Sequence, residues 1–235
     1  METKNIENMV KKEIIVISVG GSLIVPEEID SKWLSDFKEL IVSQLTNKRF
    51  ILITGGGKTA RKYQNAAKEI IELERDDLDW IGIHSTRLNA HLVRTIFRKD
   101  AHPQIVKDPT KKVNFKEKIL IAAGWKPGFS TDMDAVLLAK QFNVKKVINL
   151  SNIDYAYDKD PKKYSDAKII KEISWKNFRK IVGNKWDPGL NAPFDPVASR
   201  ESEKLKLEVA IMNGKNIENI RSYLNNEQFI GTVIK

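Results

Sequence analysis

Short runs of branched apolar residues recur along the chain and predict the strands of a buried sheet. The runs cover 14–19, 50–53, 80–83, 119–122, 147–150, 207–212 and 230–234. Most of them are continuously apolar and do not alternate with polar residues. We therefore expect both faces of the sheet to be covered by other elements.

Apolar residues between these runs follow helical spacing. One such face consists of Trp33, Leu34, Phe37, Leu40, Ile41 and Leu45, and a second consists of Ala60, Tyr63, Ala67, Ile70 and Ile71. Asp30 or Ser31 is placed to cap the first helix. Strands that alternate with helices predict an α/β fold, a three-layer αβα sandwich around a largely parallel open sheet. A single domain over 13–235 follows a polar tail, 1–12, and the least regular segments, 107–118 and 183–196, are predicted to be loops over a site or an interface.

Composition narrows the class of protein. The chain has 235 residues, of which 41% are hydrophobic, no cysteine and three histidines. Disulfides, thiolate chemistry and cysteine-ligated zinc are excluded, and a histidine-rich metal site is disfavoured. No apolar run approaches the roughly 20 residues that span a bilayer, and the first residues lack the apolar stretch of a secretion signal. We expect a cytoplasmic protein with no membrane partner.

The net charge of +9 comes from 40 basic and 31 acidic residues, with lysines dispersed along the chain. Because the lysines are dispersed, the main role that we expect for this charge is to keep the protein surface solvated, and steering of anionic ligands is the second interpretation. Basic and aromatic residues are not interleaved as in nucleic-acid-binding proteins. We expect no nucleic-acid partner.

A glycine-rich turn follows the second predicted strand. Ile51-Leu52-Ile53-Thr54 leads into Gly55-Gly56-Gly57-Lys58. Backbone without Cβ atoms can approach an anion closely, and the first N–H groups of the following helix would point at it. The segment is not a Walker A loop, because that motif needs a glycine at position 52, which is leucine. Tight packing of the turn is the alternative explanation for these glycines.

Similar junctions follow other predicted strands, at 20–22, 124–132 and 151–154. The carboxyl ends of parallel strands share one edge of a sheet, so these junctions predict a site that holds several phosphates in line. Such a site suits phosphoryl transfer, which depends on positioning and neutralised charge. We place Asp132 and Asp195 near the transfer. Both also fit helix-capping patterns, which is the alternative for each.

Six motifs in order carry a specific resemblance. They are Gly20-Gly21-Ser22, 55–63, 79–83, 86–90, Pro127-Gly128-Phe129-Ser130-Thr131-Asp132 and 157–163. Together they resemble the archaeal-type uridylate kinases of the amino-acid kinase family, from about residue 13 to the closing Gly231-Thr232-Val233-Ile234.

The resemblance implies an acceptor lobe over about 13–145 and an ATP lobe over about 146–235. It implies UMP contacts from Gly56, Gly57, Arg61, Asp79, Ser130 and Thr131, and ATP contacts from Gly20, Gly21, Ser22, Asn152, Tyr157, Asp160, Lys162 and Lys163. It also implies Mg²⁺ carried with ATP, no dedicated protein metal site, and a homohexamer built from dimers. Arginine suits a phosphate and a carboxylate suits ribose hydroxyls.

The chain departs from this family pattern at three places, one of which is Ala122-Ala123-Gly124, where part of a glycine-rich turn is usual. Ser18 stands where many members carry a lysine that neutralises the transferring phosphate, and Lys58 is the candidate substitute, with Asp132 and Asp195 completing the predicted catalytic set. Tyr155 stands where a glycine is usual in the ATP loop. The predicted activity is transfer of the ATP γ-phosphate to UMP. Alternatives are another small-molecule kinase of this fold, a non-catalytic nucleotide-binding or storage protein, and, on charge alone, a nucleic-acid-binding protein.

Overall fold

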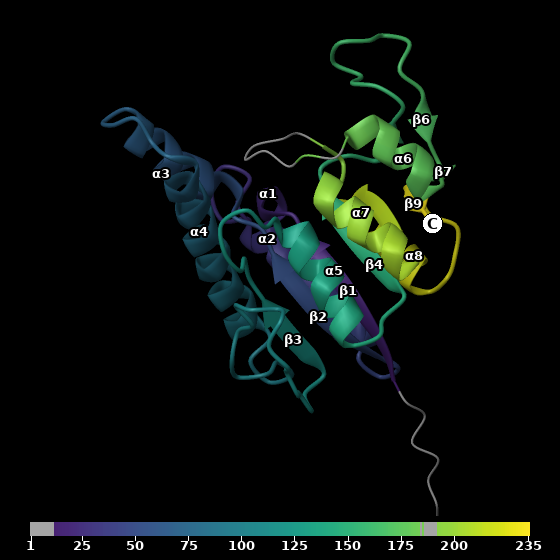
Figure 1. The fold of residues 1–235 in the computed structure, drawn as a ribbon. Helices are drawn as coiled ribbons and strands as arrows, with labels where there is room; N and C mark the ends of the chain where they lie inside the picture. The colour runs from purple at the N-terminus through teal and green to yellow at the C-terminus, as the bar shows by residue number, and fades with distance from the viewer. Residues whose placement is uncertain (1–11, 184, 186–191) are drawn as a thin grey trace, which may run out of the picture.

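A seven-stranded sheet forms the centre of the molecule, in the order β3-β2-β1-β4-β8-β9-β7 (Figure 1). The computed structural model describes residues 12–183, 185 and 192–235. Most of the predicted tail and part of the predicted loop 183–196 lie outside these residues. The elements are β1 Glu13–Val19, α1 Gly21–Ile24, α2 Ser31–Gln44, β2 Lys48–Thr54, α3 Gly57–Lys68, α4 Arg75–Ile96, β3 Ile119–Ala122, α5 Thr131–Gln141, β4 Lys146–Ser151, β5 Ala156–Tyr157, β6 Ile169–Ile170, β7 Glu172–Ile173, α6 Trp175–Val182, α7 Pro196–Leu205, β8 Glu208–Asn213, α8 Ile217–Leu224 and β9 Thr232–Ile234.

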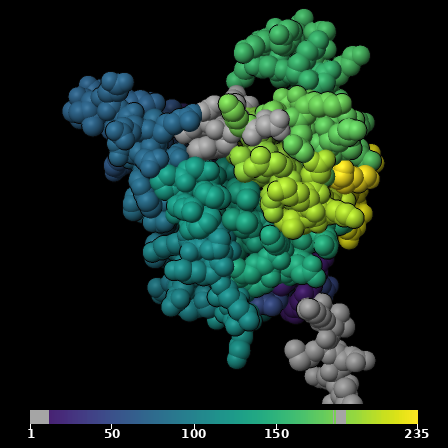
Figure 2. All heavy atoms as spheres, in the orientation of Figure 1, coloured from purple at the N-terminus to yellow at the C-terminus, as the bar shows by residue number. Residues whose placement is uncertain are grey.

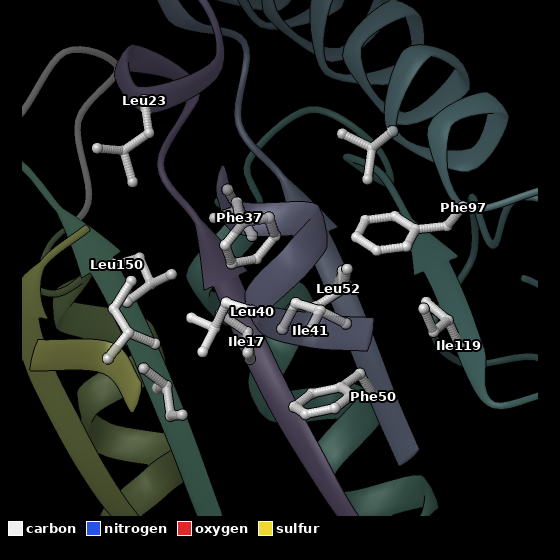
Figure 3. Close-up of a cluster of buried hydrophobic side chains, with 14 of the residues drawn as sticks. Ile17, Leu23, Phe37, Leu40, Ile41, Phe50, Leu52, Phe97, Ile119 and Leu150 are labelled. Carbon is white, nitrogen blue, oxygen red and sulfur yellow. The ribbon is translucent and has the colours of Figure 1, made fainter. Parts of the chain in front are cut away.

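The sheet is parallel except where β8 pairs with β9. Period-two alternation along the strands produces two apolar cores. Ile17 and Leu52 face the core shared with α1, α2, α4 and α8 (Figure 3), while Val16 and Ile51 face the core shared with α5, α6 and α7. The predicted α/β sandwich with helices on both faces is confirmed.

The predicted strand at 80–83 is wrong, because these residues lie inside the 22-residue helix α4. A four-residue apolar run does not distinguish a strand from a helix segment by its pattern alone. Asp76 and Asp77 occupy the first helical turn, where acidic residues are favoured, and Val93 continues the buried face further along. Trp80 is 41% exposed, as no central strand residue would be.

The order of the strands reverses between β1 and β4. From β1 the chain builds the sheet outward through β2 and β3, and from β4 it builds the opposite side through β8. Ligands of open α/β folds bind beyond the carboxyl ends of strands at such a point. The junction is closed by the Gly20 N–H, which donates to the Leu150 carbonyl at 2.8 Å.

Two segments project on the side of the molecule where β1 and β4 end (Figures 1 and 2). One is formed by the turn between α3 and α4, and the other by the segment around the small antiparallel β5–β6 pair. None of the described helices combines the length and apolar character required to cross a membrane.

Candidate active site

Two glycine turns pack backbone against backbone at the ends of β1 and β2. A Cβ atom on Gly21 would lie 2.1 Å from the Gly57 nitrogen, and a Cβ on Gly57 would lie 2.3 Å from the Gly21 carbonyl oxygen. Gly57 also has φ +65°, which side chains rarely adopt. Tight packing therefore accounts for these glycines. It leaves the anion-binding hypothesis open, since the same absence of side chains admits a phosphate.

The first turn of α3 is partly used by the protein itself. The Lys58 N–H donates to the Val25 carbonyl at 2.9 Å, so the expectation that the first amides of this helix all face an anion is wrong for Lys58. The Lys58 Nζ atom lies 3.0 Å from Glu27 Oε1. Arg61, further along α3, is exposed. The structure thus places Lys58 and Arg61 on one helix that begins at the glycine turn.

Helix α4 is hydrogen-bonded to the glycine turn at 55–57. The Asn89 amide, 3% exposed, donates to the carbonyls of Gly55 at 2.8 Å and Gly56 at 3.2 Å. Thr54 Oγ1 donates to the Thr86 carbonyl at 2.9 Å. These bonds satisfy buried polar groups that the irregular turn cannot satisfy within itself. The conformation of the turn is therefore determined by a helix that follows it in sequence.

Asp132 lies over the junction of β1 and β4. Its Oδ1 atom accepts hydrogen bonds from Ser18 Oγ at 3.0 Å and Asn149 Nδ2 at 2.8 Å, and its Oδ2 atom accepts from the Asp195 N–H at 3.2 Å. Ser18 and Asn149 are register partners in β1 and β4. Burial, with a contribution from the neighbouring Asp195 carboxylate, raises the pKa of Asp132 to about 6, against the opposing effect of these hydrogen bonds.

Asp195 caps α7 and also faces the site. Its Oδ1 atom accepts from the Ala198 N–H at 2.6 Å, and Pro196 follows at the first helical position. Burial raises the pKa of Asp195, opposed first by the Ala198 N–H and then by the Ser130 hydroxyl. The capping alternative is thus confirmed for Asp195, together with its position beside Asp132. Asp132 itself is not the cap of α5, because Ser130 accepts from the Met133 N–H at 3.2 Å, but Asp132 does lie in the first helical turn, where acidic residues are favoured.

The structure joins two of the segments predicted to contact UMP. Asp79 Oδ2, on α4, accepts from the Gly128 N–H at 2.8 Å, in the loop that leads to Ser130 and Thr131. This loop ends at the first turn of α5, next to Asp132. Asp79 is therefore joined to the loop, and the loop leads to Asp132, which is bonded to Asn149 of β4 and to Asp195 at the start of α7.

The residues predicted to contact ATP lie in two places. Gly20 and Ser22 belong to the β1 junction, and a Cβ on Gly20 would lie 2.7 Å from the Leu150 carbonyl. The others follow β4 or lie on the second projecting segment. Asn152 is exposed just after β4, Tyr157 is half-buried in β5, and Lys162 and Lys163 are exposed, with Asp160 Oδ1 accepting from the Lys162 N–H at 3.0 Å.

Two polar residues of the site were not singled out by motif. Asn149 bonds Asp132, and it is the one polar residue within the apolar run Val147-Ile148-Asn149-Leu150, a signal that was available. Asp134 is 1% exposed, and its Oδ2 atom accepts from the Trp125 N–H at 3.2 Å. Within the described part of the chain, no group of three or more histidine or carboxylate side chains is arranged to hold a metal ion.

Comparison with known proteins identifies the family. The sequence profile of the amino acid kinase family matches residues 13–213. The chain is 33% identical to a uridylate kinase of Methanobrevibacter smithii, covering 94% of this chain and 98% of that protein. It is 37% identical over 201 residues to a uridylate kinase of Thermococcus sibiricus, covering 84% and 89%.

A solved structure resembles this one over nearly its whole length. The crystal structure of uridylate kinase from Archaeoglobus fulgidus matches with a TM-score of 0.80 and 30% identity, covering 95% of this chain and 100% of that one. The UMP kinase of Ureaplasma parvum matches in fold with a TM-score of 0.77 at 19% identity.

The buried Asp134 predicts a distinctive pH dependence of stability. Burial raises the pKa of Asp134 to about 8, so between about pH 4 and 8 the folded chain holds a proton that the unfolded chain releases. The free energy of unfolding should therefore fall as pH rises through this window. Asp134→Asn removes this titration. We expect urea denaturation at pH 5, 7 and 9 to show that the free energy of unfolding of the variant rises relative to that of the parent as pH rises. Between pH 5 and pH 9 this difference should change by about 3–5 kcal/mol.

Asp76→Asn is the matched control, because Asp76 is an exposed first-turn acid of α4. It should follow the parent at all three pH values. Equal pH dependence in the parent and Asp134→Asn would show that Asp134 titrates normally.

Proposed function

Because this chain belongs to the amino acid kinase family, we propose that it is a UMP kinase that transfers the γ-phosphate of ATP to UMP, giving ADP and UDP. One observation carries the proposal: Asp132 lies over the β1–β4 junction, at the start of the helix whose preceding loop is bonded to Asp79. This arrangement offers one place where an acceptor and a donor can meet in line. Uridylate kinases that cover nearly the whole chain support UMP as the acceptor.

The chemistry asks for positioning and charge compensation and needs no general base. The UMP phosphate is already largely ionised near neutral pH, so an oxygen of it attacks the γ-phosphorus while the bond to the ADP oxygen breaks. Gly56, Gly57 and Arg61 are proposed to hold the UMP phosphate. Asp79 is proposed to accept from the ribose hydroxyls, and Ser130 and Thr131 to contact the phosphates.

The positive charge for the transfer has to be supplied around Asp132. The three groups bonded to Asp132 are neutral donors, and the neighbouring charge that shifts its pKa is the Asp195 carboxylate. We propose that Mg²⁺ enters with ATP and that Lys58 adds charge from α3 in place of a lysine at position 18. Asp132, with a pKa of about 6, is ionised at pH 7 and organises the cations and waters, together with Asp195.

The proposed donor side consists of the β1 junction and the segment after β4. Gly20, Gly21 and Ser22 would cradle the phosphates of ATP, and Asn152 would lie at the edge of the junction. The second projecting segment would contribute Tyr157 and Asp160 near the adenosine, with Lys162 and Lys163 near the phosphates. We accordingly propose an acceptor lobe over about 13–145 and an ATP lobe over about 146–235.

A second function is supported by the charge of the site. Ser18 is neutral, and Lys58 is paired with Glu27, so the chain could bind nucleotides without transferring phosphate. Calorimetry would then show binding of ATP and UMP, while an assay with ATP, Mg²⁺ and UMP would produce no UDP. If the chain phosphorylates another acceptor in place of UMP, the proposed kinase activity stands and the proposed acceptor is wrong.

We propose in addition that the chain assembles with copies of itself through the outer surface of α3 and α4. On this surface Tyr63 of α3 is 68% exposed and Leu88 of α4 is 63% exposed, and Ile70 and Ile71, in the turn that joins the two helices, are 82% and 58% exposed. Exposed apolar patches on this scale are typical of interaction sites. The hexamer implied by the sequence resemblance would contain such a contact between two copies.

The Arg61→Ala variant tests the assignment of the acceptor side. Loss of the guanidinium should raise the UMP KM by about 10–100-fold and leave the ATP KM within about twofold, because only the acceptor phosphate loses its partner. Initial rates of UDP formation at varied UMP and ATP measure both constants. Lys68→Ala, at the far end of the same helix, is the control. Equal losses on both substrates would mean that the two sides are misassigned.

The Leu88→Glu variant tests the assembly. A charge on this surface should reduce the mass observed by sedimentation velocity to that of a smaller assembly, since an unpaired carboxylate opposes burial. Ile230→Glu changes a residue that is 46% exposed outside α3 and α4, and it should leave the mass unchanged. An unchanged mass for Leu88→Glu would place the contact elsewhere.

A further inference from the structure

Gly124 and Trp125 form a corner between the end of β3 and the loop that leads to Ser130 and α5. The hydrogen bonds of this corner are all made with side chains. The Gly124 N–H donates to Thr86 Oγ1 at 2.8 Å, and the Trp125 N–H donates to Asp134 Oδ2 at 3.2 Å. Arg87 donates to the carbonyls of Gly124 at 3.4 Å and Trp125 at 2.9 Å. All four backbone polar groups of the corner thus depend on three side chains from α4 and α5.

Asp134 is the costly member of this set. It is 1% exposed, and its second oxygen, Oδ1, has no hydrogen-bond partner among the described residues. Burying a carboxyl with an unsatisfied oxygen lowers the stability of the folded state. The hydrogen bond from the Trp125 N–H compensates for only part of this loss. The charged groups that act on it are Arg87 of α4, Asp108 of the segment before β3, and Asp132 of its own helix.

The corner begins the loop that serves the proposed acceptor side. Three residues after Trp125, Gly128 is bonded to Asp79, and two residues later Ser130 caps α5. A shift of the corner would therefore move the Gly128 and Ser130 groups relative to Asp132. The segments proposed for ATP do not pass through this corner.

We infer that Asp134 is a positioning residue for the phosphate acceptor, which acts by anchoring the Trp125 N–H and so fixing the loop that carries Gly128 and Ser130. The inference rests on the proposed function for the identity of the acceptor. A role in stability alone would lower the melting temperature without separating the two substrates. A positioning role changes the KM for UMP and leaves the KM for ATP unchanged.

The test compares Asp134→Ala, Asp134→Asn and Val136→Ala. Asp134→Ala removes the anchor, so the UMP KM should rise about tenfold or more while the ATP KM stays within about twofold. In Asp134→Asn the amide oxygen can still accept from the Trp125 N–H, and the UMP KM should return to within about threefold of the parent. Val136→Ala leaves a cavity in the apolar core on the same helix and should lower the melting temperature without changing either KM.

Hydrogen exchange of peptides that cover 123–130 provides a readout without turnover. Asp134→Ala should speed exchange at this corner, and Asp134→Asn and Val136→Ala should not. An unchanged UMP KM in Asp134→Ala, equal rises of both KM values, or unchanged exchange at the corner would each overturn the inference. If the parent does not phosphorylate UMP but exchange rises in Asp134→Ala alone, the proposed function fails and the anchoring by Asp134 stands.

Discussion

The carboxylate of Asp132 ties two strands and two helices together at the point where the strand order reverses. Ser18 reaches it from β1, Asn149 from the partner position of β4, and the Asp195 N–H from the start of α7, while Asp132 itself lies in the first turn of α5. Burying a carboxylate is costly unless donors compensate for lost water. Three donors therefore have to converge, which constrains how α5 and α7 begin over the sheet.

The glycine turns impose a second constraint on the same edge. Their backbones are too close for any side chain at Gly21 or Gly57, and α4 holds the turn through Asn89. Packing and anion binding are compatible here, because a backbone that can approach another backbone can also approach a phosphate. The fold thus presents closely packed backbone on one flank and neutral donors around Asp132, so that in the proposed reaction much of the positive charge comes with the nucleotide, as Mg²⁺, or from α3.

The sequence predicted six of the seven strands of the sheet, because continuous branched apolar runs are typical of buried strands, and it missed the two-residue strand β7. It also predicted that the strand-end junctions meet, since parallel strands share one edge. It was wrong at 80–83, where an apolar run belongs to a helix that packs on one side and faces solvent on the other. The four-residue run alone does not distinguish a strand from a helix, and the signals that favour the helix, two first-turn acids and a continued apolar face, lie outside the run.

The polar network was harder to predict than the strands. Asp195 was identified as either a cap or a site residue, and the geometry gives it both positions. Asn149 and Asp134 lie within sequences that look apolar or helix-initiating, and their roles depend on partners at Asp132 and Trp125. Such contacts between residues distant in sequence become visible only once the elements are placed.

The kinetics of Asp132→Asn test the central claim most directly, because the variant keeps the size of the side chain and removes its charge. If Asp132 organises phosphoryl transfer, kcat for UDP formation should fall by about 100-fold or more, while the KM values for ATP and UMP change by less than about threefold. A kcat within about threefold of the parent would contradict the account. It would show that the junction of β1 and β4 is held by Asp132 for stability and that transfer occurs without it.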